Sequence, residues 1–155
     1  MSQLEIGQAI PAFTVSSTAG ELTQDHLLGQ ITVLFFYPKD NTPGCTTESQ
    51  NFRDALSQFQ QLGVQIIGVS RDTLASHERF IDKQTLNFPL IADTEEILCN
   101  IFNVIKMKNM YGKQVRGIER STFVIDAQGA LLHQWRGVRV PGHVDQVLAT
   151  LTAQH

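Results

Sequence analysis

The chain lacks the features that mark several common classes of protein. It has only two cysteines, Cys45 and Cys99, and neither a C-x₂-C nor an H-x₃-H spacing, so a disulfide framework, a dithiol motif and a metal site are all unexpected. No apolar run approaches the ~20 residues that cross a bilayer, and no glycine-rich phosphate loop is present. The formal net charge is −3 and the basic residues are scattered. We therefore expect no metal, no cofactor, no nucleic-acid partner and no membrane partner.

The size and composition are those of one ordinary domain. A chain of 155 residues with 42% hydrophobic residues can form a core without disulfides, so we expect a single domain over residues 1–155. The first residues lack a basic region followed by an apolar stretch, which favours the cytoplasm. In a reducing compartment each cysteine is left with a redox role or a packing role.

The hydrophobic pattern predicts an α/β fold. Short runs rich in β-branched and aromatic residues predict strands at 31–37, 64–70, 88–92, 121–126 and 131–135. Apolar periodicity and capping residues predict helices at 43–61, from 72 or 73 onward, at 94–105 with Asp93 and Glu96 as a capping box, and at 144–152. Such alternation is typical of a mixed sheet with helices on both faces. Residues 105–119 have the composition of an exposed loop that could border the site.

Cys45 is the most informative residue of the chain. Pro38 ends the first predicted strand, and Thr42 and Pro43 suit the N-cap and the first position of the following helix. Cys45 then falls in the first turn, where free backbone N–H groups and the helix dipole stabilise a thiolate. We therefore expect Cys45 to be ionised at neutral pH. The alternative is an inert buried thiol, which needs neither a helix N-terminus nor a polar Thr-Pro-Gly turn.

The motif around Cys45 resembles a known family. Pro38-x-x-x-Thr42-x-x-Cys45 is similar to the peroxidatic motif of peroxiredoxins, and the whole stretch 37–48 resembles their Q-type branch, also called bacterioferritin comigratory protein. Further similar blocks cover nearly the whole chain, at residues 6–13, 68–72, 88–93 and 120–126. The resemblance implies a thioredoxin-like fold with an N-terminal extension. It also implies an antioxidant thiol peroxidase that reduces hydrogen peroxide and organic hydroperoxides by cycling Cys45 between thiolate and sulfenic acid.

The resemblance also suggests roles for the residues around Cys45. Cys45 would be the nucleophile, and Thr42, one turn earlier, would offer its hydroxyl to the thiolate or the peroxide as well as capping the helix. Arg120 matches the family's active-site arginine, an assignment that rests on the resemblance alone. Pro38 would shield the pocket from water. Glu48, one turn after Cys45, would orient Arg120 or the helix N-terminus, or else be a solvated carboxylate.

The chain departs from the Q-type pattern at one position. Many members carry a resolving cysteine five residues after the peroxidatic one, where this chain has Gln50. The remaining candidate is Cys99, which the helical pattern places on the flank of its helix, away from the buried centre. We therefore expect a one-cysteine cycle, with a monomer or weak dimer reduced by an external thiol such as thioredoxin, glutaredoxin or glutathione. A peroxide sensor without fast turnover and a scaffold or holdase without a reactive thiol are the alternative functions.

Overall fold

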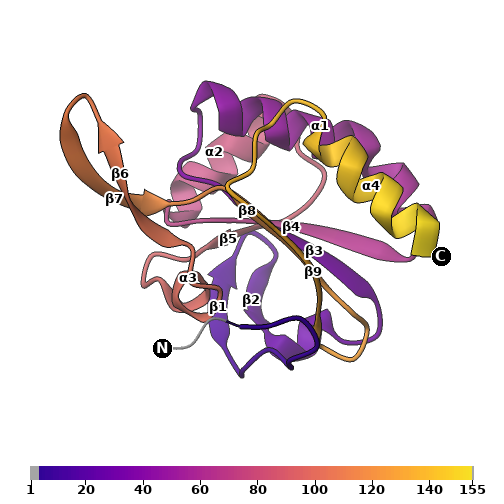
Figure 1. Cartoon of the computed structure of the whole chain (residues 1–155). Coiled ribbons are helices and arrows are strands. Elements are labelled where there is room, and N and C mark those ends of the chain that lie inside the picture. Colours follow the sequence, from indigo (N-terminus) through magenta and orange to yellow (C-terminus); the bar gives the residue numbers. More distant parts are fainter. Residues whose placement is uncertain (1–3, 155) are drawn as a thin grey trace.

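The computed structural model describes residues 4–154, in which a seven-stranded mixed sheet lies between helices (Figure 1). The three middle strands, β3 (Ile31–Phe36), β4 (Val64–Ser70) and β5 (Leu90–Ala92), are parallel. The strands that flank them, β1 (Thr14–Ser17) and β8 (Ser121–Ile125), pair antiparallel with β5 and β3. The predicted mixed sheet is thus confirmed. The strands follow the spatial order β2 (Gly20–Thr23), β1 (Thr14–Ser17), β5 (Leu90–Ala92), β4 (Val64–Ser70), β3 (Ile31–Phe36), β8 (Ser121–Ile125) and β9 (Leu131–Arg136).

Helices lie on both faces of the sheet. Figure 1 shows α1 and α4 side by side on one face, and α3 on the other together with the N-terminal segment. The α1 helix begins where predicted, because Pro43 has the fixed φ that suits a first helical position. The helical segments are η1 (Gln24–Leu27), α1 (Pro43–Gln61), α2 (Leu74–Gln84), α3 (Ile97–Ile101) and α4 (His143–Gln154).

Two apolar clusters form the core, one on each face of the sheet. Successive side chains of a strand point to opposite faces, so β3 contributes to both clusters. Val33 and Phe35 pack with α1 and α4, whereas Leu34 and Phe36 pack with α3 and the N-terminal segment. Both clusters share one sheet, which supports the prediction of a single domain over residues 1–155. That extent stays a prediction. Within residues 4–154 no helix is both long and apolar enough to cross a bilayer.

The expectation of a loop over residues 105–119 is wrong. These residues form a hairpin of β6 (Ile105–Met110) and β7 (Lys113–Ile118), which Figure 1 shows extending away from the main sheet. Its two turn residues, Tyr111 and Gly112, both have positive φ, as a tight two-residue hairpin turn requires. Both strands are largely exposed and lack the run of buried apolar residues that marks strands of the main sheet, although Ile105 and Met107 do alternate with Lys106 and Lys108.

The predicted helix over 94–105 is also mostly wrong. The α3 helix covers only Ile97–Ile101, and Glu96 before it has positive φ and makes no side-chain cap. Asp93 does bind the helix start, since its carboxylate accepts hydrogen bonds from the backbone N–H groups of Leu98 and Cys99. The Glu96 carboxylate instead pairs with guanidinium groups of β7 and of the segment after β4, and this pairing replaces the capping box.

Candidate active site

The end of β3 and the start of α1 place Cys45 inside the protein. After Phe36 the chain turns through residues 37–42, with Asn41 in the left-handed region at φ 65°. Thr42 is extended, as an N-cap residue should be, and its carbonyl accepts the first helical hydrogen bond from Thr46 N–H at 2.9 Å. Cys45 is only 1% exposed, because it continues the buried face of α1. The thiol is therefore enclosed and lies in the first turn of a long helix.

Strand pairing brings Arg120 to the same place. The strand β8 lies antiparallel to β3, with Ser121 opposite Phe36, so Arg120 stands just beyond the end of β3. Its Nη2 donates a hydrogen bond to Cys45 Sγ at 3.4 Å, and its Nη1 donates to Glu48 Oε1 at 2.7 Å. The structure thus brings together three of the predicted site residues. Arg120 bridges a sulfur and a carboxylate that are one helical turn apart.

Burial affects the ionisation of the residues that Arg120 brings together. Glu48 is fully buried, and burial raises the pKa of its carboxyl to about 7, although Arg120 acts in the opposite direction. Burial by itself lowers the pKa of Arg120, but Glu48 and Cys45 beside it raise that pKa above its ordinary value. The second carboxylate oxygen of Glu48, Oε2, is buried and has no hydrogen-bond partner among the described residues. The Arg120 guanidinium therefore donates hydrogen bonds to two groups that can each carry a negative charge, the Cys45 sulfur and the Glu48 carboxylate.

Gly44 allows Arg120 to approach Cys45 closely, and this role was not predicted from the sequence. A Cβ atom at Gly44 would lie 3.1 Å from Arg120 Nη2, which is tighter than an ordinary contact. Glycine is a poor helix former, so its place in the first turn of α1 was a usable signal. The missing side chain leaves the space in which the guanidinium lies against the sulfur.

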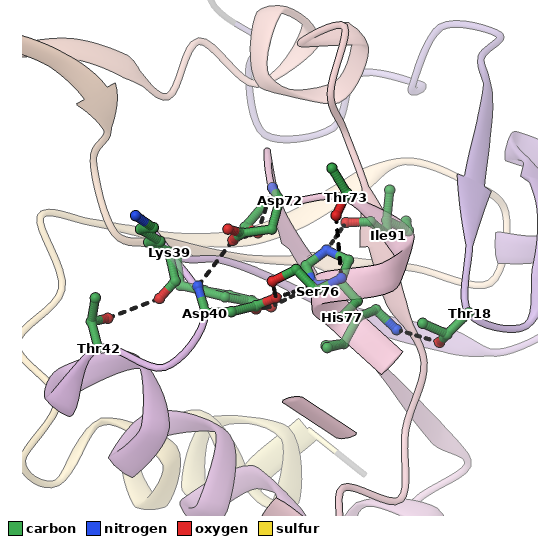
Figure 2. Close-up of polar contacts among 12 residues, drawn as sticks. Thr18, Lys39, Asp40, Thr42, Asp72, Thr73, Ser76, His77 and Ile91 are labelled. Carbon is green, nitrogen blue, oxygen red and sulfur yellow. Dashed lines mark hydrogen bonds and ion pairs between the residues drawn. The ribbon is translucent and has the colours of Figure 1, made fainter. Parts of the chain in front are cut away.

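Thr42 and Pro38 lie at the edge of this group. The N-cap position of Thr42 is confirmed, but the expected side-chain cap is wrong, because Thr42 Oγ1 donates to the carbonyl of Lys39 at 2.8 Å (Figure 2). No hydrogen bond joins Thr42 to Cys45 within residues 4–154. The Lys39 carbonyl in the turn therefore accepts the hydrogen bond that the Thr42 hydroxyl donates. Thr42 and Pro38 are both half-buried.

Lys108 and His143 also lie near Arg120. Lys108 belongs to residues 105–119, which were expected to border the site, whereas no site role was predicted for His143. Burial and the positive charge of Arg120 lower the pKa of Lys108, whose Nζ donates to the Ile118 carbonyl. The β6–β7 hairpin therefore borders the site, as expected of residues 105–119. Burial and Arg120 also lower the pKa of His143 to about 4, so this ring is neutral at neutral pH. Its Nε2 lies 2.7 Å from Thr122 Oγ1.

Cys99 lies apart from the group around Cys45. It belongs to the apolar cluster on the α3 face, whereas Cys45 belongs to the cluster on the α1 face. The expectation that Cys99 lies on the flank of its helix, away from the buried centre, is wrong, because its side chain is fully buried between the short α3 helix and the sheet. Burial first, and then the neighbouring Asp93, raise the pKa of the Cys99 thiol. Both cysteines are free.

A thioredoxin-like fold that buries one cysteine in the first turn of a helix, with an arginine against its sulfur, is the arrangement of a thiol-dependent peroxidase. Comparison with known proteins agrees with this class. Residues 6–134 match the model of the AhpC/TSA family, so the chain belongs to that family, and its relatives are peroxiredoxins.

Three similar proteins illustrate the match. The chain is 54% identical to peroxiredoxin Bcp of Xanthomonas campestris pv. campestris, over 81% of this chain and 78% of the relative. It superposes on a structure of X. campestris bacterioferritin comigratory protein, studied for alkyl peroxide reduction, with a TM-score of 0.89 and 48% identity over 97% of both chains. A PrxQ variant from Xylella fastidiosa gives a TM-score of 0.93 and 42% identity over 99% of both chains.

These matches confirm three predictions from the sequence. The fold is thioredoxin-like, the resemblance to the Q-type peroxiredoxins is genuine, and the chain is a thiol-dependent peroxidase, an oxidoreductase. Its substrate is a peroxide and its reductant is a thiol. The roles of individual residues are inferred from the geometry of this chain.

Proposed function

We propose that Cys45 is the peroxidatic nucleophile and that it reduces hydrogen peroxide and organic hydroperoxides. The observation that carries this proposal is the contact between Arg120 Nη2 and Cys45 Sγ, 3.4 Å, in the first turn of α1. A cation and a helix N-terminus both favour the thiolate, which is the reactive form of cysteine. The alkyl peroxide reduction for which the X. campestris relative was studied supports the wider substrate range.

The reaction is a displacement at oxygen. The Cys45 thiolate attacks one peroxide oxygen, a new S–O bond forms, and the O–O bond breaks. The departing oxygen leaves as hydroxide or alkoxide and takes up a proton, so that the products are water or an alcohol and a sulfenic acid on Cys45. Arg120 is placed to stabilise the negative charge as it moves from sulfur to the departing oxygen.

The other predicted residues support this reaction in different ways. Glu48 holds Arg120 through the 2.7 Å hydrogen bond and so aims its second nitrogen at the sulfur. Thr42 would release the Lys39 carbonyl and turn its hydroxyl toward a bound peroxide. Pro38, half-buried beside the turn, would limit access of water. Thr42 is thus assigned to the catalytic residues with Cys45 and Arg120, and Pro38 and Glu48 are assigned to the substrate pocket.

An external thiol would complete the cycle. Cys99 is buried on the other face of the sheet, so the Cys45 sulfenic acid is expected to be reduced by thioredoxin, glutaredoxin or glutathione. A cycle of this kind needs no second subunit, which agrees with a monomer or weak dimer. Two free cysteines without a disulfide also suit the reducing cytoplasm as the place of action.

A stopped-flow measurement tests the central assignment. Wild-type protein mixed with hydrogen peroxide or an alkyl hydroperoxide should consume it with dithiothreitol as reductant, and Cys45→Ser should lose this activity. The matched control is Cys99→Ser, which removes the other thiol and should keep the activity. If Cys45→Ser kept turnover while Cys99→Ser lost it, the assignment of the nucleophile would be wrong.

A further inference from the structure

A second polar cluster lies buried beside the turn that leads to Cys45. Asp40 in the turn and His77 on α2 are both buried, and the ring nitrogen Nδ1 of His77 lies 2.8 Å from Asp40 Oδ2. The Tyr37 hydroxyl donates to Asp40 Oδ1 at 2.7 Å, and the Ser76 hydroxyl donates to Asp40 Oδ2 at 2.8 Å. Figure 2 shows His77 between Asp40 and the backbone of Ile91. Asp40 thus accepts hydrogen bonds on both oxygens.

The partners of His77 define where its protons lie. Its Nε2 lies 2.9 Å from the carbonyl oxygen of Ile91, and a carbonyl oxygen only accepts, so Nε2 carries a hydrogen. Its Nδ1 faces Asp40, whose other contacts are hydroxyl donors that favour the carboxylate. Burial raises the pKa of Asp40, but the hydrogen bonds from His77 and Tyr37 outweigh it and hold this pKa below the ordinary value. With the Asp40 carboxylate opposite at 2.8 Å, Nδ1 is placed to donate as well, so the geometry suits a ring that donates from both nitrogens.

Asp40 is tied to its surroundings through its backbone as well. Its N–H donates to Asp72 Oδ2 at 2.9 Å (Figure 2). Asp72 in turn accepts from Ser70 Oγ at 2.5 Å. Polar atoms of Asp40, Asp72 and His77 all lie within 4.8 Å of one another, so Asp72 belongs to the same cluster. The turn between β3 and α1 is therefore fastened to two other segments, the end of β4 and the start of α2.

The turn held in this way leads directly into the residues that are proposed to act on peroxide. Asp40 lies two residues before Thr42 and five before Cys45, and the Thr42 hydroxyl is itself held by the Lys39 carbonyl next to Asp40. We propose that Asp40 and His77 form a buried ion pair that positions the turn and the first turn of α1 for attack on peroxide. Both are positioning residues, since neither forms a hydrogen bond with Cys45 among the described residues. The proposal rests on the proposed function of Cys45.

The energetics of buried charges support a positioning role over a purely stabilising one. Taking two charges out of water costs free energy, and buried ion pairs are often no more stabilising than apolar groups of similar size. What such a pair supplies is a defined geometry for the segment that carries it. A displacement of about 1 Å at a reacting group can lower a rate about 100-fold, so a small shift of this turn should be visible in the kinetics.

Nuclear magnetic resonance tests the ion pair without any measurement of activity. With ¹⁵N-labelled histidine, the His77 ring should show two protonated nitrogens at about pH 8, where an unperturbed imidazole is almost entirely neutral. In Asp40→Asn the ring should lose one of these protons. A wild-type ring with a single N–H at this pH would overturn the ion pair.

Kinetics then test the positioning. Asp40→Asn and His77→Gln should each slow the oxidation of Cys45 by peroxide about 10- to 100-fold. The control Leu131→Ala removes buried side-chain volume on the other face of the sheet and should destabilise the protein without slowing this step. A rate within about two-fold of wild type in both folded variants would overturn the positioning role. A wild-type protein that does not react at all would instead count against the proposed function.

Milder variants keep the test valid if these two fail to fold. Tyr37→Phe and Ser76→Ala each remove one hydroxyl donor to Asp40 and leave the pair with His77 in place. Each should slow Cys45 oxidation a few-fold while the ring keeps both protons. Unchanged rates in both variants would contradict the proposal.

Discussion

Cys45 and Cys99 are both buried, but they lie on opposite faces of the central sheet. Cys45 packs among the side chains between the sheet and α1, and Cys99 packs among those between the sheet and α3. A disulfide requires the two Cα atoms to come within about 7 Å. Such a bond would therefore require one of these segments to leave the sheet, together with the apolar side chains that hold it.

The first prediction follows from this separation. One equivalent of peroxide should convert Cys45 to a sulfenic acid, seen as the added mass of one oxygen after trapping, and Cys99→Ser should retain most of its turnover with an external thiol. Intact-mass analysis and peptide mapping measure both. A loss of two hydrogens with a Cys45–Cys99 linkage, and turnover that collapses in Cys99→Ser, would instead establish an internal resolving cysteine.

The second prediction concerns Arg120. Arg120→Ala removes the donor to Cys45 Sγ and leaves the buried Glu48 without its partner, so the rate constant for oxidation should fall about 100-fold. Arg120→Lys keeps the charge but loses the forked geometry that reaches both groups, so it should recover only part of the rate. Stopped-flow kinetics at several peroxide concentrations give the rate constants. Equal rates in wild type and Arg120→Ala would remove Arg120 from the site.

The third prediction separates stability from activity at Gly44. Gly44→Ala replaces a poor helix former and should leave the free energy of unfolding unchanged or raise it, by up to about 1 kcal/mol. The added Cβ, 3.1 Å from Arg120 Nη2, should push the guanidinium away and slow oxidation several-fold. The control is Gly117→Ala, where the nearest contact of a Cβ is an ordinary 3.8 Å. Urea unfolding and stopped-flow kinetics on the same samples decide the matter, and a Gly44→Ala rate equal to wild type would count against the close approach.

The fourth prediction is a pH dependence of stability due to Glu48. Its pKa is about 7 in the folded protein and near 4.5 in the unfolded chain, so the folded state binds this proton more tightly. The contribution of Glu48 to the free energy of unfolding is therefore largest below pH 4.5. This contribution falls as the pH rises to 7, by at most about 1.4 kcal/mol per pH unit. In Glu48→Gln this loss should vanish, so the variant gains stability relative to wild type across the window. Urea unfolding between about pH 4 and pH 8 measures the difference.

His143 provides the opposite slope as an internal check. Its pKa falls from 6.5 to about 4 on folding, so its contribution is full above pH 6.5 and is lost as pH falls toward 4. The two buried groups thus act against each other in wild type, and His143→Gln should lose stability relative to wild type as pH rises over that window. Parallel changes in Glu48→Gln and His143→Gln would mean that another group controls the dependence.

Local sequence determined the element that carries the chemistry. The β-branched and aromatic run of β3, the stop at Pro38, and Thr42 with Pro43 at the helix start are short-range signals, and they placed Cys45 in the first turn of α1. Signals of this kind fail where strands are short or polar. The four-residue strands β1 and β2 at one side of the sheet were not predicted, and the lysine-rich β6–β7 hairpin was predicted as a loop.

Only the tertiary structure decided which residues meet Cys45. Arg120 lies 75 residues away in sequence and reaches the sulfur because β8 pairs with β3, a choice of neighbours that no local pattern contains. The same holds for His77, which pairs with Asp40 across 37 residues, and for Cys99, whose burial depends on the sheet above a one-turn helix. Periodicity reports how a segment folds on itself, whereas contacts between segments depend on how the whole sheet is assembled.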